Sequence, residues 1–214
     1  MFSLLGVNGA GKTTVIKMLS CLTKPTMGDA YILGNSVIFQ QNEVKKHISL
    51  SPQETAIAPN LSVLENLELI CGINAFSDEK RQQKVIEMSE SLGLKDVLLK
   101  KAGKLSGGWQ RRLSIAMALI SEPKILFLDE PTLGLDIIVR SELWDLIRSL
   151  KGRVTIILTT HYMEEAEALS DRVGIMKDGR LLVVGTPQEL ISSVGADRFE
   201  NAFIKIVSEE GQRK

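Results

Sequence analysis

Residues 6–13 read Gly6-Val7-Asn8-Gly9-Ala10-Gly11-Lys12-Thr13. Two glycines flank four residues, and a lysine and a threonine follow, which is the spacing of a phosphate-binding loop. The apolar run of residues 1–5 precedes the loop, and a helical pattern follows it. Strand, glycine-rich loop and helix in this order surround phosphate oxygens with backbone N–H groups and a helix N-terminus. The stretch therefore predicts a nucleotide-binding α/β fold.

The composition excludes several classes of protein. The 214 residues are 44% hydrophobic and 24% charged, as in ordinary globular domains. Lysine and arginine number 26 and so do the carboxylates, so no bulk positive field would hold nucleic acid. Cys21 and Cys71 lack metal-ligand spacing, which indicates free thiols in a reducing cytosol. No apolar stretch approaches the ~18 residues of a membrane span, so we expect any membrane role to act through a partner.

Strand and helix patterns alternate along the rest of the chain. Short strands are predicted over residues 28–33, 47–50, 124–129 and 154–158, and a hairpin around Asp178-Gly179. Only helical patterns occur from about 58 to about 122, beginning with a capping box at Ser62 to Glu65. A second capping signal, Thr186 with Glu189, predicts a helix start near Pro187. We predict a mostly parallel sheet flanked by helices, with an inserted all-helical subdomain. The whole chain, 1–214, would be one domain, with a core of 1–57 and 123–214 and a helical subdomain of about 58–122.

Two adjacent carboxylates, Asp129 and Glu130, end the apolar stretch of residues 124–129. Carboxylates at the end of a buried strand are costly unless something compensates their charge, and Mg²⁺ would do so. We expect Asp129 to be a metal ligand beside Thr13, and Lys12 to reach the β- and γ-phosphates. Glu130 would point to the other side of the strand and polarise the attacking water.

A second anion site is indicated at Leu105-Ser106-Gly107-Gly108, which opens an apolar helix. A serine cap and two residues without side chains leave the helix N-terminus accessible to an anion. One ATP does not need two complete phosphate cradles in one chain, unless the second serves the ATP of another copy. On its own, a serine such as Ser106 is more often only a helix cap. Taken singly, Gln53 and His161 do not indicate a functional site either.

Taken in order, these motifs resemble those of the ATP-binding cassette proteins. The resemblance rests on residues 6–13, Gln53, residues 105–108, the apolar strand ending in Asp129-Glu130, Gly134-Leu135-Asp136, and His161. It spans nearly the whole chain, and the serine-glycine-glycine signature separates this family from other phosphate-loop NTPases. It implies a phosphate-loop NTPase with a RecA-like core, in which the inserted helical subdomain carries the signature.

The resemblance also implies a site shared by two cassettes, which sandwich two ATP molecules and hydrolyse them with Mg²⁺. Catalytic roles would fall to Glu130, His161 and Lys12, with His161 contacting the γ-phosphate and the attacking water. The metal would be held by Thr13, Gln53 and Asp129. The nucleotide would be bound by Asn8, Gly9, Ala10, Gly11, Lys12, Thr13, Thr14, Gln53 and Asp136, and by Ser106, Gly107 and Gly108 of the other chain.

The segments 160–167 and 185–187 and the aromatic C-terminal helix look like the branch that drives drug, lipid or polysaccharide exporters. This implies a transmembrane permease as partner, bound to the helical subdomain, and a second cassette that is identical or a paralogue. The chain would then be cytoplasmic and peripheral on the inner face of the membrane. The alternatives are a soluble cassette ATPase acting in repair or translation, and an inactive truncated cassette.

The beginning of the chain departs from the family pattern. The resemblance implies a few dozen residues before the loop, with two strands and an aromatic residue that stacks on adenine. Here Met1 stands almost at the loop, so we expect a truncated gene product or a misplaced start codon. Trp109 replaces the glutamine that often follows the two glycines, and packing in the core is its simplest role.

Overall fold

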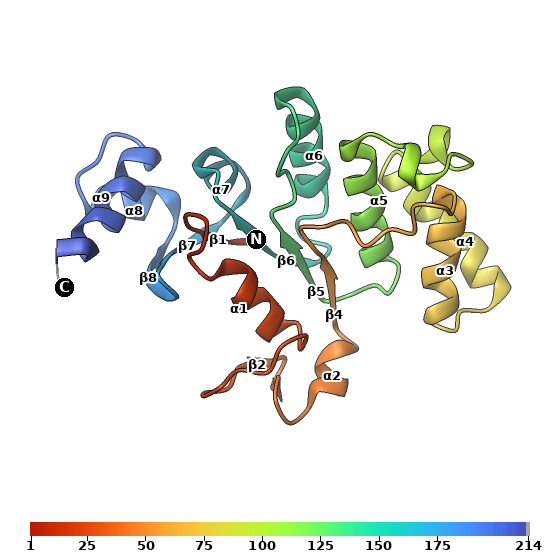
Figure 1. Cartoon of the computed structure of the whole chain (residues 1–214), viewed down its shortest axis with the longest axis horizontal. Helices are drawn as coiled ribbons and strands as arrows, with labels where there is room; N and C mark the ends of the chain where they lie inside the picture. Colours follow the sequence, from red (N-terminus) through yellow and green to blue (C-terminus); the bar gives the residue numbers. More distant parts are fainter. Residues whose placement is uncertain (213–214) are drawn as a thin grey trace. The chain divides into compact units, whose positions relative to one another are not determined.

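The computed structural model describes the backbone of residues 1–212 and the side chains of residues 1–208. The chain forms two compact units, Met1–Val44 with the chain from Thr155 onward, and Lys45–Val154 (Figure 1). The predicted core and helical subdomain have other boundaries, and that division stays a prediction.

The sheet of the first unit has the strand order β6-β1-β7-β8. Its strands are β1 (Phe2–Leu5), β6 (Thr155–Thr160), β7 (Arg172–Lys177) and β8 (Arg180–Gly185). β1 runs parallel to both neighbours, with Leu5 opposite Thr160 and Ile175. β7 and β8 are antiparallel, and the turn residues Asp178 and Gly179 have φ values of 50° and 76°. The predicted parallel strands and hairpin are therefore confirmed.

Helices cover both faces of this sheet because successive residues of β1 point to opposite sides. Leu5 belongs to a core cluster with Val173 and Ile175 that α7, α8 and α9 complete, whereas Leu4 packs with Ala10 and Met176 on the other face. The helices are α1 (Lys12–Leu19), α7 (Met163–Leu169), α8 (Pro187–Ser193) and α9 (Phe199–Gln212). α8 and α9 lie side by side next to β8 (Figure 1).

The predicted strand over residues 28–33 is shorter than expected. Only Tyr31–Ile32 (β2) is extended, and it pairs with Asn35–Ser36 (β3) in a two-stranded hairpin. Leu33 and Gly34 turn the chain with φ values of 50° and 81°. The turn comes before the apolar run is complete, which leaves Leu33 exposed.

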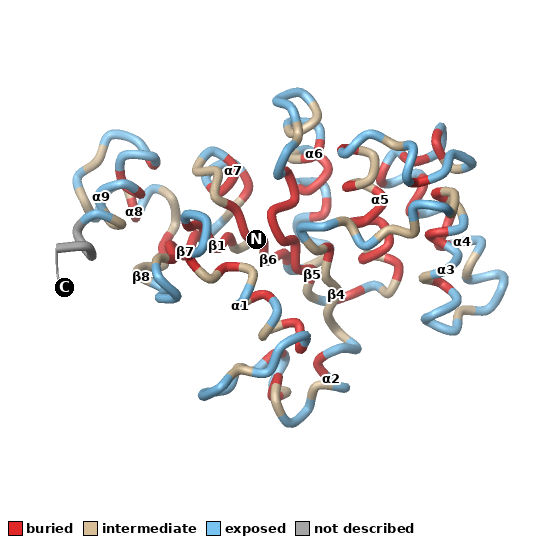
Figure 2. Tube along the Cα trace, viewed as in Figure 1, coloured by how far each residue is buried: buried red, intermediate tan, exposed pale blue. Residues whose placement is uncertain are grey.

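The second unit contains two parallel strands, β4 (Ile48–Ser51) and β5 (Ile125–Asp129). Its helices are α3 (Val63–Ile73), α4 (Asp78–Ser91), η1 (Lys95–Val97), η2 (Ala102–Lys104), α5 (Gly107–Leu119) and α6 (Ile137–Ser149), and α2 (Gln41–Lys45) ends where this unit begins. Between residues 58 and 122 all the described elements are helical except for one isolated bridge between Ser62 and Lys101. The buried core of the unit includes Leu126, Phe127 and Leu128, which belong to β5, a largely buried strand (Figure 2).

Local capping signals are confirmed in detail. The Ser62 hydroxyl accepts the N–H of Glu65 at 3.1 Å, and the Glu65 carboxylate accepts the N–H of Ser62 at 2.6 Å. Thr186 and Glu189 form the same reciprocal pair at the start of α8. Both cysteines are buried, and burial raises the pKa of the Cys71 thiol. In the part of the chain that the structure describes, no helix is long and apolar enough to cross a membrane.

Candidate functional site

The predicted phosphate-binding loop joins β1 to α1 in the first unit. Gly9 and Gly11 have φ values of 82° and 97°, a region that L side chains rarely adopt. The Lys12 side chain is 6% exposed, and its ammonium donates to the carbonyl of Gly6 at 2.7 Å and to that of Val7 at 3.4 Å. The lysine thus lies across its own loop, and its charge is held at the start of α1.

The β7–β8 hairpin packs against this loop and is hydrogen-bonded to it. The N–H of Gly179 donates to the carbonyl of Ala10 at 3.0 Å. A Cβ added to Gly6 would lie 2.5 Å from the carbonyl oxygen of Met176, which no side chain could tolerate. Gly6 is therefore required by close backbone packing and not only by the phosphate. The sequence predicted the hairpin but not this contact, which joins residues far apart along the chain.

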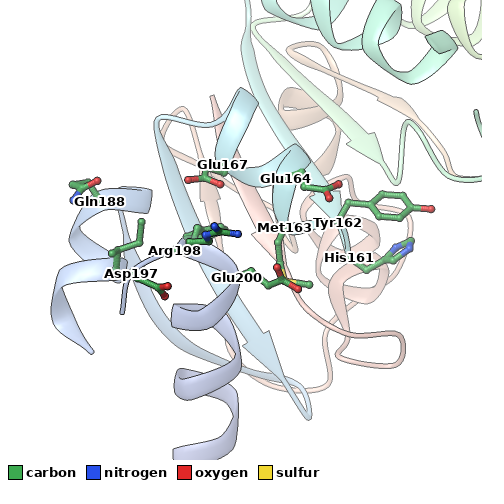
Figure 3. Close-up of a pocket in the computed structure, with 11 residues that line it drawn as sticks. His161, Tyr162, Met163, Glu164, Glu167, Gln188, Asp197, Arg198 and Glu200 are labelled. Atoms are coloured by element: carbon green, nitrogen blue, oxygen red, sulfur yellow. The ribbon is translucent and has the colours of Figure 1, made fainter. Parts of the chain in front are cut away.

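His161 follows β6 directly and so lies at the same edge of the sheet as the loop. Because β6 and β1 are parallel neighbours, their carboxyl ends meet, and the N–H of Gly6 donates to the carbonyl of Thr160 at 3.3 Å. The His161 and Tyr162 rings have centroids 4.1 Å apart, and Figure 3 shows them side by side. The first unit therefore brings the predicted loop residues, Lys12 and His161 to one edge.

His161 also lines a pocket of about 460 Å³ that continues over α7 and the beginning of α9 (Figure 3). The carboxylates of Glu164, Glu167 and Glu200 and the guanidinium of Arg198 lie on its walls. None of its lining residues belongs to the phosphate-binding loop. The candidate nucleotide site is therefore defined by the loop and its lysine and not by this pocket.

In the second unit, Asp129 ends β5 and is buried. Glu130, which is 5% exposed, lies beyond the strand with a φ of 49°. Because Glu130 lies outside the strand in a left-handed conformation, the strand's alternation of side chains does not set its direction, and the expectation that it points to the other side stays a prediction. This conformation is rare outside glycine and costs roughly 1–3 kcal/mol, so the surrounding structure has to stabilise the backbone at this residue.

Gln53 lies near the ends of the same two strands. β4 and β5 are paired with Ser51 opposite Leu128, so the residues that follow them emerge at one edge of this strand pair. The Gln53 side chain is exposed, whereas its backbone carbonyl accepts a hydrogen bond from Arg111 of α5 at 2.6 Å. No sequence pattern indicates this arginine, because a basic residue near a helix N-terminus is more often solvated.

The signature residues occupy the start of α5. Ser106 holds the N-cap position with an extended backbone, but its hydroxyl makes no capping hydrogen bond. Ser106 and Gly107 are exposed, whereas Gly108 is buried and its Cα faces Val139 of α6. The serine therefore occupies the cap position without a side-chain cap, and its role in binding an anion stays a prediction.

Asp136 caps the next helix, α6. Its carboxylate accepts the N–H groups of Ile138 and Val139, both at 3.0 Å. Two turns precede Asp136. In the first, the N–H of Leu133 donates to the backbone carbonyl of Glu130, and in the second the N–H of Leu135 donates to that of Thr132. The segment between Glu130 and Asp136 is thus tightly folded, and its aspartate has a structural role whether or not a nucleotide is bound.

The two signature glycines should respond differently to alanine. A Cβ at Gly108 would overlap Val139, whereas one at Gly107 would lie 3.5 Å from Leu135, an ordinary contact. We expect Gly108→Ala to lower the free energy of unfolding by about 1–3 kcal/mol, and Gly107→Ala to change it by less than about 0.5 kcal/mol. Urea unfolding of both variants checks this, and equal midpoints would contradict the packing role of Gly108.

The parallel strands, the flanking helices and the loop with its lysine define a phosphate-loop nucleotide-binding protein. The sequence profile described as ABC transporter matches residues 1–133 of this chain. The chain therefore belongs to the ABC transporter family, which confirms both the resemblance and the predicted fold class.

Sequence relatives and solved structures agree with this family. The chain is 41% identical over 92% of its length to the daunorubicin resistance ATP-binding protein DrrA3 of Streptomyces coeruleorubidus. It is 38% identical over 97% of its length to the probable multidrug ABC transporter ATP-binding protein YbhF of Escherichia coli. It spans 62% of the first protein and 37% of the second.

The similar solved structures include a dimeric post-hydrolysis state of an ATP-binding cassette with ADP and phosphate. That chain is 30% identical, with a TM-score of 0.77 over 87% of this chain and 84% of its own length. The ATP-binding subunit of an ABC transporter matches with a TM-score of 0.83 at 25% identity, over 97% of this chain and 88% of that one.

Proposed function

We propose that this chain is the ATP-hydrolysing cassette of an export-type transporter and that two cassettes close on two ATP molecules. The observation that carries the proposal is the position of Lys12, which lies across a phosphate-binding loop at the same sheet edge as His161. Each nucleotide would also be bound by the signature residues of the other cassette. The exposure of Ser106 and Gly107 at the N-terminus of α5 supports this part of the proposal.

The first unit would hold the triphosphate. Backbone N–H groups of residues 8–14 surround the phosphate oxygens, and Lys12 neutralises the β- and γ-phosphates. Thr13 carries a hydroxyl, Gln53 an amide and Asp129 a carboxylate, which are the hard oxygen donors that Mg²⁺ prefers, so these residues would hold the ion. When bound, Mg²⁺ supplies charge neutralisation to the phosphates.

Hydrolysis would use the buried carboxylate that follows β5. Glu130 accepts a proton from the attacking water, and the turn between residues 130 and 136 holds it in place. His161 contacts the γ-phosphate from the end of β6. The nucleotide of the second chain is bound by the signature residues Ser106, Gly107 and Gly108. Asp136 caps the end of α6 that lies against Gly108.

The exporter assignment is supported by the relatives, whose names include daunorubicin resistance, probable multidrug transporter and phospholipid-transporting ATPase. We therefore propose a transmembrane permease as partner, docked on the helical subdomain of about 58–122, and a position on the cytoplasmic face of the membrane. The equal numbers of basic and acidic residues disfavour the alternative, a cassette acting on nucleic acid.

Removal of the metal is the direct test of the proposed chemistry. With Mg²⁺ and ATP, the purified chain should release phosphate, and chelation with EDTA should reduce release to the level of buffer because the triphosphate loses its charge neutralisation. Addition of excess Mg²⁺ should restore the rate. Release that continues unchanged in EDTA, or no release in Mg²⁺, would contradict the proposal.

The choice between a transporter and a nucleic-acid ATPase needs a separate measurement. A tagged chain should co-purify from detergent-solubilised membranes with a multispanning permease, in an amount close to one permease domain per cassette. RNA or DNA binding that weakens steeply with salt would support the alternative instead.

A further inference from the structure

Arg111 lies in the second turn of α5 and is 5% exposed. Its Nη1 donates to the carbonyl oxygen of Pro52 and its Nη2 to that of Gln53, each at 2.6 Å. Both carbonyls lie just beyond the last residue of β4. One guanidinium therefore joins the signature helix to the backbone of the predicted metal-binding glutamine.

The chemistry of this contact is specific to arginine. A buried cation is costly unless it is hydrogen-bonded, and bonds from a charged donor are roughly twice as strong as neutral ones. The planar fork of arginine can reach two successive carbonyls at once, whereas the lysine ammonium is a point charge on a flexible stem. The two acceptors thus fix the guanidinium and the loop against each other.

A second contact reinforces the first. Ser114, three residues after Arg111 and so on the same face of α5, shares a 2.8 Å hydrogen bond with Ser51, the last residue of β4. The adjacent Gln110 is bonded elsewhere, since its side-chain amide donates to the carbonyls of Ala102 and Leu105. Arg111 and Ser114 therefore form one stripe of α5 that is hydrogen-bonded to residues 51–53.

We propose that Arg111 is a positioning residue that makes Gln53 and the signature residues Ser106 to Gly108 move as one body. The inference rests on the proposed function, in which Gln53 serves the nucleotide of its own chain and the signature serves that of the second chain. A displacement at one nucleotide is then transmitted through one guanidinium to the other. Arg111 couples the two ATP sites and contacts neither nucleotide.

The test compares Arg111→Lys with Arg112→Lys in steady-state ATP hydrolysis. Arg112 is the matched control because its bond, 2.8 Å to Glu142 of α6, lies outside the Gln53 contact. For Arg111→Lys we expect kcat to fall about 10-fold and the Hill coefficient for ATP to fall to about 1. The affinity for ATP at micromolar protein without Mg²⁺ should stay within about two-fold, since Lys12 and its loop set it.

A second variant separates coupling from folding. The double substitution Ser51→Ala with Ser114→Ala removes both partners of one bond, which leaves no buried hydroxyl unsatisfied and so costs little stability. It should lower the Hill coefficient with the urea midpoint nearly unchanged. If Arg111→Lys does not fold, Arg111→Gln, whose amide can still donate to one of the two carbonyls, replaces it in the same comparison with Arg112→Lys.

The outcomes distinguish the inference from the proposed function. If the unsubstituted chain hydrolyses ATP cooperatively and both variants keep its kcat and Hill coefficient, the role of Arg111 is overturned while the function stands. If Arg112→Lys loses cooperativity as fully as Arg111→Lys, the specific coupling is also overturned. If the unsubstituted chain does not hydrolyse ATP, the proposed function fails first, and the inference fails with it.

Discussion

Glu130→Gln should lower the rate of ATP hydrolysis by about 10²- to 10⁴-fold, the usual contribution of a general base. Glutamine has nearly the volume of glutamate, so it fits the buried site after β5, but its amide cannot accept the proton of the attacking water. ATP should still bind and close the dimer. The chain should therefore elute as a dimer with saturating Mg²⁺ and ATP, which light scattering can measure directly.

Glu142→Gln is the matched control for this prediction. Glu142 is an exposed carboxylate of α6 that pairs with Arg112, and surface ion pairs contribute only about 0–1 kcal/mol. Its substitution should leave hydrolysis within about two-fold of the original rate. Monomeric elution of Glu130→Gln with saturating Mg²⁺ and ATP would count against both the base and the dimer.

Lys12→Met should weaken ATP binding by about 10²- to 4 × 10³-fold. The substitution keeps the buried methylene stem and removes the ammonium that bonds the Gly6 carbonyl. Loss of one partner of a buried charge pair costs about 3–5 kcal/mol, and every 1.4 kcal/mol is tenfold in affinity. Titration of a fluorescent ATP analogue measures the loss, and the rise in unfolding temperature with ATP should disappear in the same variant.

Lys17→Met provides the comparison, because Lys17 lies on an exposed position of the same helix, α1. It should bind ATP as the unsubstituted chain does. Retention of full ATP affinity in Lys12→Met would show that the loop lysine does not contact the phosphates, and the proposed site would then be wrong.

Several parts of the fold could be predicted because their causes are local in the sequence. The capping boxes at Ser62 and Thr186 involve residues three apart, and the Asp178-Gly179 turn is set by two adjacent residues. The spacing of the phosphate-binding loop is likewise local. Short-range hydrogen bonds and allowed φ values decide such features whatever the rest of the chain does.

Other features depend on contacts between distant segments. No spacing could indicate that Gly6 lies against Met176, that Gly108 leaves room for Val139, or that Arg111 bonds the Gln53 carbonyl. The left-handed conformation of Glu130 likewise has no signal in the local sequence. Its energetic cost has to be met by the packing and turn bonds around it.

The sequence by itself therefore determined the kind of elements, the nucleotide-binding loop and the family, because spacing, caps and turns act within a few residues. Tertiary structure alone decided three features. These are the packing of the hairpin against the loop, the left-handed backbone of Glu130, and the arginine that joins the signature helix to Gln53. Those arrangements arise when close packing and buried hydrogen bonds bring together residues that are far apart along the chain.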